Sequence, residues 1–98
     1  MKIKVVKMNP GGEGVTALYI DGSLRVSGDQ YHDKISDWIK GFLAGLKFAR
    51  DEGWYQVAHV ETWYIPDRYF DEYDLEELIS CPPLSFEDLP TEFLTKEY

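Results

Sequence analysis

The hydrophobic and polar positions of the chain follow two periods, which predict short strands on either side of one long helix. Between Asp29 and Gly53, apolar residues recur every three or four positions, the period of an amphipathic helix with one buried side. The apolar positions that set this period are Ile35, Trp38, Ile39, Phe42, Leu46 and Ala49. Asp29 can cap the first turn, and Gly53 suits the left-handed residue that ends many helices. The pattern therefore predicts a helix of about twenty residues, roughly 30 Å long.

Four other segments have the composition and alternation of β-strands. They are Lys2–Met8, Val15–Ile20, Ser23–Ser27 and Trp54–Ile65. Asp21-Gly22 separates the second segment from the third and is a strong signal for a two-residue hairpin turn. The long helix then connects the third strand to the fourth as a β-α-β crossover. We expect an α+β fold in which this helix packs on a small, mainly antiparallel four-stranded sheet.

A two-residue turn also predicts which residues of the hairpin share a face. It places Tyr19 opposite Leu24 and on the same side of the sheet as Ala17. The full set of residues on this face is Val15, Ala17, Tyr19, Leu24 and Val26. We expect this face to meet the helix. Leu18 and Ile20 lie on the other face, where they need cover from the C-terminal segment or from a second copy of the protein.

Two glycines interrupt the long helix. Gly41 and Gly45 lie four residues apart, and glycine inside a helix costs about 1 kcal/mol relative to alanine. Close approach of another backbone would explain both of them. Two arrangements are open: tight packing of the helix on its own sheet, or contact between the helices of two copies.

The C-terminal segment, residues 66–98, is predicted to form short helical turns broken by prolines. Turns are expected at 67–72 and at 75–79, and shorter ones follow the last prolines. The residues that would anchor the segment onto the rest of the protein are Phe86, Leu89, Phe93 and Leu94. These anchors favour a folded segment, so we expect residues 1–98 to form a single domain.

Charge is distributed unevenly along the chain. Residues 1–60 carry eight Lys or Arg and seven Asp or Glu, a net charge of +1, whereas residues 61–98 carry two and eleven, a net charge of −9. Together they give the net charge of −8 of the whole chain. An acidic C-terminal part suits a basic protein partner. It argues against direct binding to nucleic acid, which needs a surface of Lys and Arg.

The composition also predicts the cellular setting. One cysteine, Cys81, cannot form an internal disulfide and suits a reducing compartment. The opening stretch MKIKVVKMNP has no apolar run typical of a signal peptide, and no later stretch approaches the length of a membrane span. We therefore expect a soluble, cytoplasmic protein with no membrane partner.

The carboxylates are densest where aromatic residues are interleaved with them, between Asp67 and Asp88. The candidate partner-binding residues are Asp67, Tyr69, Asp71, Glu72, Tyr73, Asp74, Glu76, Glu77, Glu87 and Asp88. On helical turns, carboxylates four residues apart are separated by about 6 Å at Cβ, a spacing of the order of the phosphates along one nucleic-acid strand. Such an array repels itself, so either a partner or solubility must favour it. We expect no metal site here and no cofactor.

A weaker candidate for chemistry is the pair His59 and Glu61. Two positions apart in a predicted strand, they share a face and could line a small pocket under the C-terminal segment. No nucleophile with a matching motif accompanies them, so a structural role is favoured and we expect no catalytic residues.

The stretch from VTALYIDGSLRVSGDQ to FARDEGW, Val15 to Trp54, joins a hairpin closed by Asp-Gly to a single helix that ends in Gly-Trp. In a small acidic protein this arrangement resembles phage-encoded anti-CRISPR inhibitors, over about 40% of the chain. Some members of that group are DNA mimics, whose carboxylates cover the basic DNA-reading surface of a nuclease. The resemblance implies a non-enzymatic inhibitor of a basic, nucleic-acid-binding protein such as a host defence nuclease. The alternatives are a bacterial immunity protein or antitoxin, and a homodimeric structural or ligand-binding domain.

Overall fold

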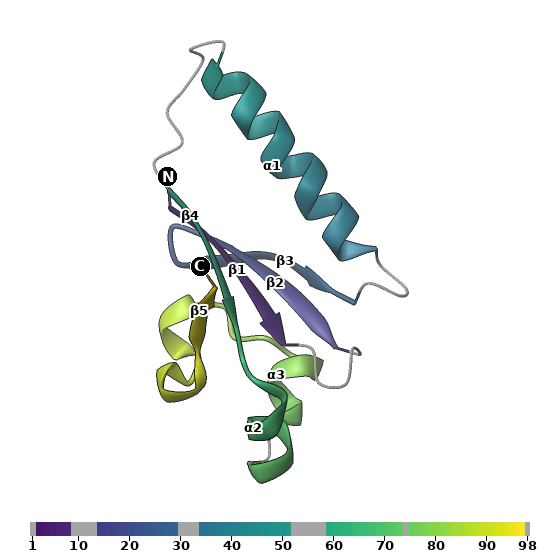
Figure 1. Cartoon of the computed structure of the whole chain (residues 1–98), viewed down its shortest axis with the longest axis vertical. Coiled ribbons are helices and arrows are strands. Elements are labelled where there is room, and N and C mark those ends of the chain that lie inside the picture. Colours follow the sequence, from purple (N-terminus) through teal and green to yellow (C-terminus); the bar gives the residue numbers. More distant parts are fainter. Residues whose placement is uncertain (1, 9–13, 30–33, 52–58, 74, 98) are drawn as a thin grey trace.

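One helix, a five-stranded sheet and a set of short helical turns lie one above another along the long axis of the molecule (Figure 1). The computed structural model describes residues 2–8, 14–29, 34–51, 59–73 and 75–97. The molecule measures 46 × 27 × 24 Å along its principal axes. Two clusters of buried apolar residues lie on opposite faces of the sheet, one under each outer layer.

The sheet has the strand order β3-β2-β1-β4-β5 and is mixed. Its strands are β1 (Lys2–Met8), β2 (Val15–Ile20), β3 (Ser23–Gly28), β4 (His59–Tyr64) and β5 (Thr95–Glu97). β1 pairs antiparallel with β2 and parallel with β4, and the β2–β3 and β4–β5 pairs are antiparallel. The α+β class is confirmed, whereas the predicted four-stranded, mainly antiparallel sheet is corrected to a five-stranded mixed sheet. The additional strand, β5, has three residues, too few to show a two-residue period in the sequence.

The main helix, α1 (Ile35–Asp51), connects β3 to β4, which run parallel with two strands between them. It begins later than predicted. Trp38 donates its backbone N–H to the carbonyl of Lys34 at 3.2 Å in the first turn, so Asp29 is not the N-cap. Gly53 and the first residues of the predicted fourth strand lie outside the described residues.

Part of the predicted buried stripe of α1 faces away from the sheet. The buried members of the stripe are Ile35, Ile39 and Leu46. Phe42 is half-buried and Trp38 is exposed. Trp38 precedes Ile39 by one residue, which is about 100° around a helix, so both cannot point at the sheet. The side chain of Ala49 lies outside the described residues.

The helix covers the face of the hairpin that was predicted to lie away from it, and the C-terminal layer covers the other face. Leu18, on the face expected to lie away from the helix, is fully buried under α1 beside Ile3 and Val5. Ala17 and Tyr19, which were expected to meet the helix, are buried against the C-terminal layer. Both faces are apolar, so alternation alone does not determine which layer covers which face.

A β-bulge changes the register of the hairpin as well. Leu18, rather than Ala17, lies opposite Val26, and Arg25 is the extra residue between this pair and the turn. The bulge turns Val26 to the α1 face, where it packs on the buried cluster there. The helix therefore covers one more apolar side chain of β3 than the regular register allows.

The C-terminal layer consists of α2 (Asp67–Glu72), α3 (Glu76–Ser80) and two 3₁₀ turns, η2 (Phe86–Asp88) and η3 (Thr91–Phe93). Phe86 is buried in the core of this face. Backbone hydrogen bonds fix the layer to the hairpin: the N–H of Leu24 donates to the carbonyl of Leu84 and that of Phe86 to the carbonyl of Gly22, each at 2.8 Å. The predicted turns and their apolar anchoring are therefore observed.

Candidate interaction surface

The sequence-predicted partner-binding residues divide between two parts of the C-terminal layer. The members on and between α2 and α3, which we call the acidic end, are Asp67, Tyr69, Asp71, Glu72, Tyr73, Glu76 and Glu77. Figure 1 shows α2 and α3 at the end of the molecule opposite α1. Glu87 and Asp88 lie on η2, which packs on the sheet through Phe86. Asp74 lies outside the described residues.

All described carboxylates of the acidic end are exposed, as are Glu87 and Asp88. The lengths of α2 and α3, six and five residues, explain this exposure. Each helix makes less than two turns, so its few half-buried apolar positions take the inner side and its charges take the outer side. The sequence pattern thus places its carboxylates in solvent.

The aromatic residues of the acidic end form a cluster with η3. The ring centroids of Tyr69 and Tyr73 each lie 4.7 Å from that of Phe93, and 6.3 Å from each other. Tyr69 is half-buried and packs on the core, whereas Tyr73 is 50% exposed. Tyr73 is therefore the aromatic side chain of this cluster that a partner can reach, and Phe93 supports it from behind.

The negative charge of the acidic end is poorly balanced. Residues 67–77 contain six carboxylates and one basic residue, Arg68. Six carboxylates against one basic residue leave a net charge of −5 over this stretch. The acidic end therefore carries excess negative charge into the solvent.

Arg68 is directed at a tyrosine. Its Nη2 atom donates a hydrogen bond to the hydroxyl of Tyr69 at 3.1 Å, and its guanidinium carbon lies 4.9 Å from the centroid of that ring. This hydrogen bond raises the pKa of Arg68, and the nearby charge of Glu72 acts in the same direction. Arg68 thus stays cationic and packs on the neighbouring Tyr69, while the described carboxylates around it remain exposed.

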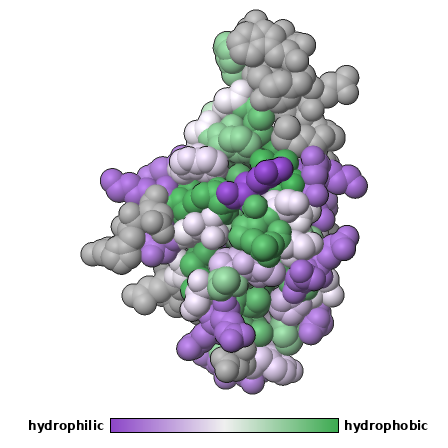
Figure 2. Space-filling view, turned by 180° about the vertical axis from the view of Figure 1, so that it is seen from behind, coloured by the Kyte–Doolittle hydropathy of each residue, from purple (hydrophilic) through white to green (hydrophobic). Residues whose placement is uncertain are grey.

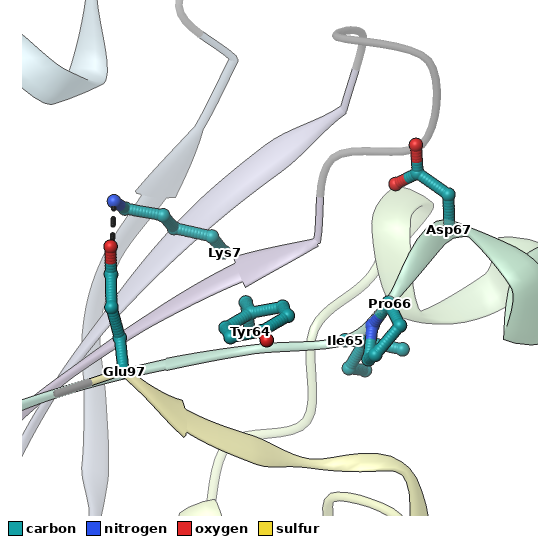
Figure 3. Close-up of a pocket in the computed structure, with 6 residues that line it drawn as sticks. All are labelled: Lys7, Tyr64, Ile65, Pro66, Asp67 and Glu97. Carbon is teal, nitrogen blue, oxygen red and sulfur yellow. Dashed lines mark hydrogen bonds and ion pairs between the residues drawn. The ribbon is translucent and has the colours of Figure 1, made fainter.

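A pocket of about 470 Å³ lies where β1 and β4 end and α2 begins (Figure 3). Its lining residues are Lys7, Tyr64, Ile65, Pro66, Asp67 and Glu97. Figure 3 shows Lys7 and Glu97 pointing toward each other on one side, with Asp67 on the opposite side. The Nζ atom of Lys7 lies 3.4 Å from a carboxylate oxygen of Glu97, so these two charges of the lining pair with each other.

Of the candidate pair His59 and Glu61, the structure describes only the side chain of Glu61. Glu61 accepts a hydrogen bond from the Trp63 indole nitrogen at 3.0 Å and pairs with Lys96 of β5 at 3.6 Å. The side chain of His59 lies outside the described residues. Glu61 is therefore part of the contact between β4 and β5, and it does not line the pocket of Figure 3.

Sequence reasoning did not foresee the contact between half-buried Lys4 and the buried ring of Phe86. The Nζ atom of Lys4 lies 4.0 Å from the ring centroid of Phe86, and the Phe86 and Trp63 rings are 6.0 Å apart. The alternation of β1 places Lys4 on this face, but nothing near it in the sequence indicates an aromatic partner eighty-two positions later. The contact helps to hold η2, and with it Glu87 and Asp88, on the sheet.

Apolar surface is also exposed away from the acidic end. Seen from behind, the molecule has hydrophobic residues along its middle and hydrophilic residues on both sides (Figure 2). The large apolar side chains that are exposed are Trp38, Phe48, Val60, Tyr64, Tyr73 and Leu84. Two of these lie on α1, the layer farthest from the acidic end (Figure 1).

Within the described parts of the chain, no group of three or more His, Cys, Asp or Glu side chains is arranged to hold a metal ion. None of the helices described is both long and apolar enough to cross a membrane. Comparison of the chain with protein-family models, with curated proteins and with solved structures found no match. The function is therefore argued from the acidic end itself.

Proposed function

We propose that the chain is a non-enzymatic protein that binds and inhibits a basic, nucleic-acid-binding protein such as a host defence nuclease. The observation that carries this proposal is the acidic end, where exposed carboxylates accompany the exposed ring of Tyr73 at one end of the molecule (Figure 1). Such a surface attracts the Lys- and Arg-rich groove that normally takes nucleic acid. Once in that groove, it excludes nucleic acid by occupying the same space.

The geometry of the acidic end suits this role in two ways. Asp67 and Asp71 are four residues apart on α2, a spacing of about 6 Å at Cβ that is of the order of the phosphates along a nucleic-acid strand. Tyr73 supplies an aromatic anchor of the kind found at interface hot spots. Because Tyr73 already packs on Phe93, it loses little conformational freedom when a partner covers it.

A solvated acidic face that serves only solubility is the competing explanation. It predicts that the identity of the carboxylates does not matter as long as the net charge is kept. It also gives no role to the exposed Tyr73. The two explanations therefore differ in whether position, and not just total charge, determines activity.

The test is charge reversal at positions within and outside the acidic end. The double variant Asp71→Lys, Glu77→Lys reverses two exposed carboxylates of α2 and α3. The matched control, Asp37→Lys with Glu97→Lys, makes the same change of net charge at two exposed carboxylates elsewhere. We expect the first variant to lose capture of the partner from host-cell lysate and to associate more slowly with the purified partner. The control should retain both.

Nucleic-acid competition then tests the mode of inhibition. The wild-type protein should displace DNA or RNA from the partner, and its association rate should fall as salt is raised. Equal binding by the two double variants, or a partner that still binds its nucleic acid in the complex, would contradict the proposal. The identity of the captured protein distinguishes a defence nuclease from the toxin of an immunity or antitoxin pair.

A further inference from the structure

One side of α1 is an exposed apolar surface. Trp38 is 50% exposed and Phe48 is 57% exposed, although both are large hydrophobic residues. Gly41 and Gly45, which are also exposed, lie between them in the sequence. We call these four residues the aromatic face of α1. The buried residues of the helix point elsewhere, into the sheet.

The part of the chain that the structure describes gives no packing reason for the glycines of this face. A Cβ atom built at Gly41 or Gly45 meets no heavy atom within 4 Å in the described structure. Of the two arrangements that the sequence left open, tight packing of these glycines on their own sheet is not observed. Each glycine still costs about 1 kcal/mol relative to alanine inside a helix. Close approach of a backbone from outside the chain would account for that cost.

The order of residues on the face is the same in both directions. The steps between successive residues of the face are three positions from Trp38 to Gly41, four from Gly41 to Gly45 and three from Gly45 to Phe48. The sequence of aromatic, glycine, glycine and aromatic residues is therefore the same when it is read backwards. A second α1 laid antiparallel therefore places Trp38 opposite Phe48 of the partner, and Gly41 opposite Gly45 of the partner. A two-fold symmetric interface requires this kind of self-complementarity, because each patch must match itself reversed.

The distribution of charge favours a second copy at this end of the molecule. α1 (Ile35–Asp51) contains three Lys or Arg and two Asp, a net charge of +1, within a chain of net charge −8. The acidic α2 and α3 lie at the opposite end of the molecule, whose longest dimension is 46 Å (Figure 1). Contact through α1 keeps the two acidic ends far apart. Their separation then exceeds the Debye length, about 8 Å at physiological ionic strength, so salt largely screens the repulsion between them.

We propose that the aromatic face of α1 is the interface of a homodimer, in which two copies of α1 pack antiparallel about a two-fold axis. The glycines let the two helix backbones approach closely, and the aromatic residues at either end cover one another. One helix face per copy is smaller than the roughly 800 Å² per partner of a standard interface, so the dimer dissociates on dilution. The inference does not depend on the proposed function, since both acidic ends remain exposed.

Sedimentation over a range from about 1 μM to about 1 mM tests the dimer. Wild-type protein should shift from monomer to dimer as the concentration rises. Trp38→Glu should weaken association by about tenfold or more, because it buries a charge against the partner's Phe48. The control Leu84→Glu makes the same charge change at a residue that is 79% exposed and lies outside α1. A wild-type protein that stays monomeric, or equal effects of the two substitutions, would overturn the proposal.

Cross-linking tests the antiparallel register without disturbing the core. In a Cys81→Ser background, Trp38→Cys and Phe48→Cys place thiols at two exposed positions that face each other in the antiparallel pair, and both glycines are kept. When the two variants are mixed, we expect disulfide formation between unlike chains to exceed that between like chains. A parallel pair would give the reverse preference. Preference for like chains, or no cross-link above the level of an exposed control such as Ser80→Cys, would rule out the arrangement.

Discussion

A single tyrosine joins the sheet to the C-terminal layer. Tyr19 is fully buried, its hydroxyl donates to the carbonyl of Pro83 at 2.7 Å, and its ring meets that of Phe86 edge-on at 5.7 Å. Burial, and secondarily the negative charge of Asp88, raises the pKa of Tyr19 to about 12. One side chain thus supplies packing, a hydrogen bond and a titratable group at the same contact.

Tyr19→Phe should destabilise the protein by about 1 kcal/mol near neutral pH, because it removes the hydrogen bond and leaves the Pro83 carbonyl without it. In the unfolded chain the tyrosine hydroxyl ionises near its ordinary pKa of 10.0, and in the folded protein near 12. The neutral tyrosine therefore stabilises the fold fully below pH 10 and loses this contribution as the pH rises toward 12. Chemical denaturation of both proteins at about pH 8 and about pH 11 measures their free energies of unfolding. Between these two pH values the free energy of unfolding should fall less in the variant than in the wild-type protein. Identical losses would show that Tyr19 does not titrate as inferred.

Glycines in this fold have opposite roles at two positions. Gly22 has φ +85° in the hairpin turn and follows Asp21 at φ 51°, so both turn residues are left-handed. Gly41 and Gly45 have no such constraint and sit in open space. Substitution by alanine should therefore lower the stability of the protein at Gly22 and raise it at Gly41 and Gly45.

Gly41→Ala and Gly45→Ala should each stabilise the dilute, monomeric protein by about 1 kcal/mol, because alanine is the better helix former and nothing obstructs its methyl group. Gly22→Ala should destabilise by a similar amount or more, since alanine resists positive φ. Thermal unfolding at low micromolar concentration measures all three variants. A loss of stability at Gly41 or Gly45 would mean that their surroundings are more crowded than the structure shows.

At the scale of elements, the sequence predicted those whose signals are local. The hairpin turn at Asp21-Gly22, β1 and a helix between the third and fourth strands are all observed, because period and turn chemistry act over a few residues. The choice of which sheet face the helix covers was not predictable. Both faces of the sheet are apolar. Which of them the helix covers depends on the bulge at Arg25 and on Phe86, a distant residue that packs on the other face.

Replacing an aromatic residue by alanine should reduce stability more in the C-terminal layer than in α1. Phe86→Ala should lower the free energy of unfolding by about 3–5 kcal/mol, because the ring is buried against Tyr19 and Trp63. Phe42→Ala should cost clearly less, since Phe42 is half-buried at the edge of α1. Chemical denaturation of the two variants measures the difference. A greater loss at Phe42 would place the main stabilising core under α1 instead of under the C-terminal layer.

At the scale of the whole molecule, charge and apolar surface are separated along the long axis (Figure 1). Sequence reasoning could locate the acidic segment, because a charge count needs no structure. It could not tell which tyrosine of that segment stays accessible. Both rings lie 4.7 Å from that of Phe93, twenty or more positions further along the chain, but only Tyr69 also packs on the core, and Tyr73 stays exposed. Of the aromatic face of α1, only Trp38 belonged to the stripe that the helical period assigned to the core, and it is 50% exposed.

Unbalanced charge at the acidic end should make the stability of the protein depend on salt. Asp71→Asn together with Glu77→Gln should raise the melting temperature at low ionic strength, because each removes an exposed charge from among like charges. The gain should largely disappear near 1 M salt, where the Debye length is about 3 Å. Glu97→Gln is the control, since its carboxylate pairs with Lys7 and its neutralisation should give no gain. Melting curves of these variants at about 10 mM and about 1 M salt measure the effect. If the paired and unpaired carboxylates respond alike, self-repulsion at the acidic end is negligible, and a partner is no longer needed to explain why so many carboxylates are gathered there.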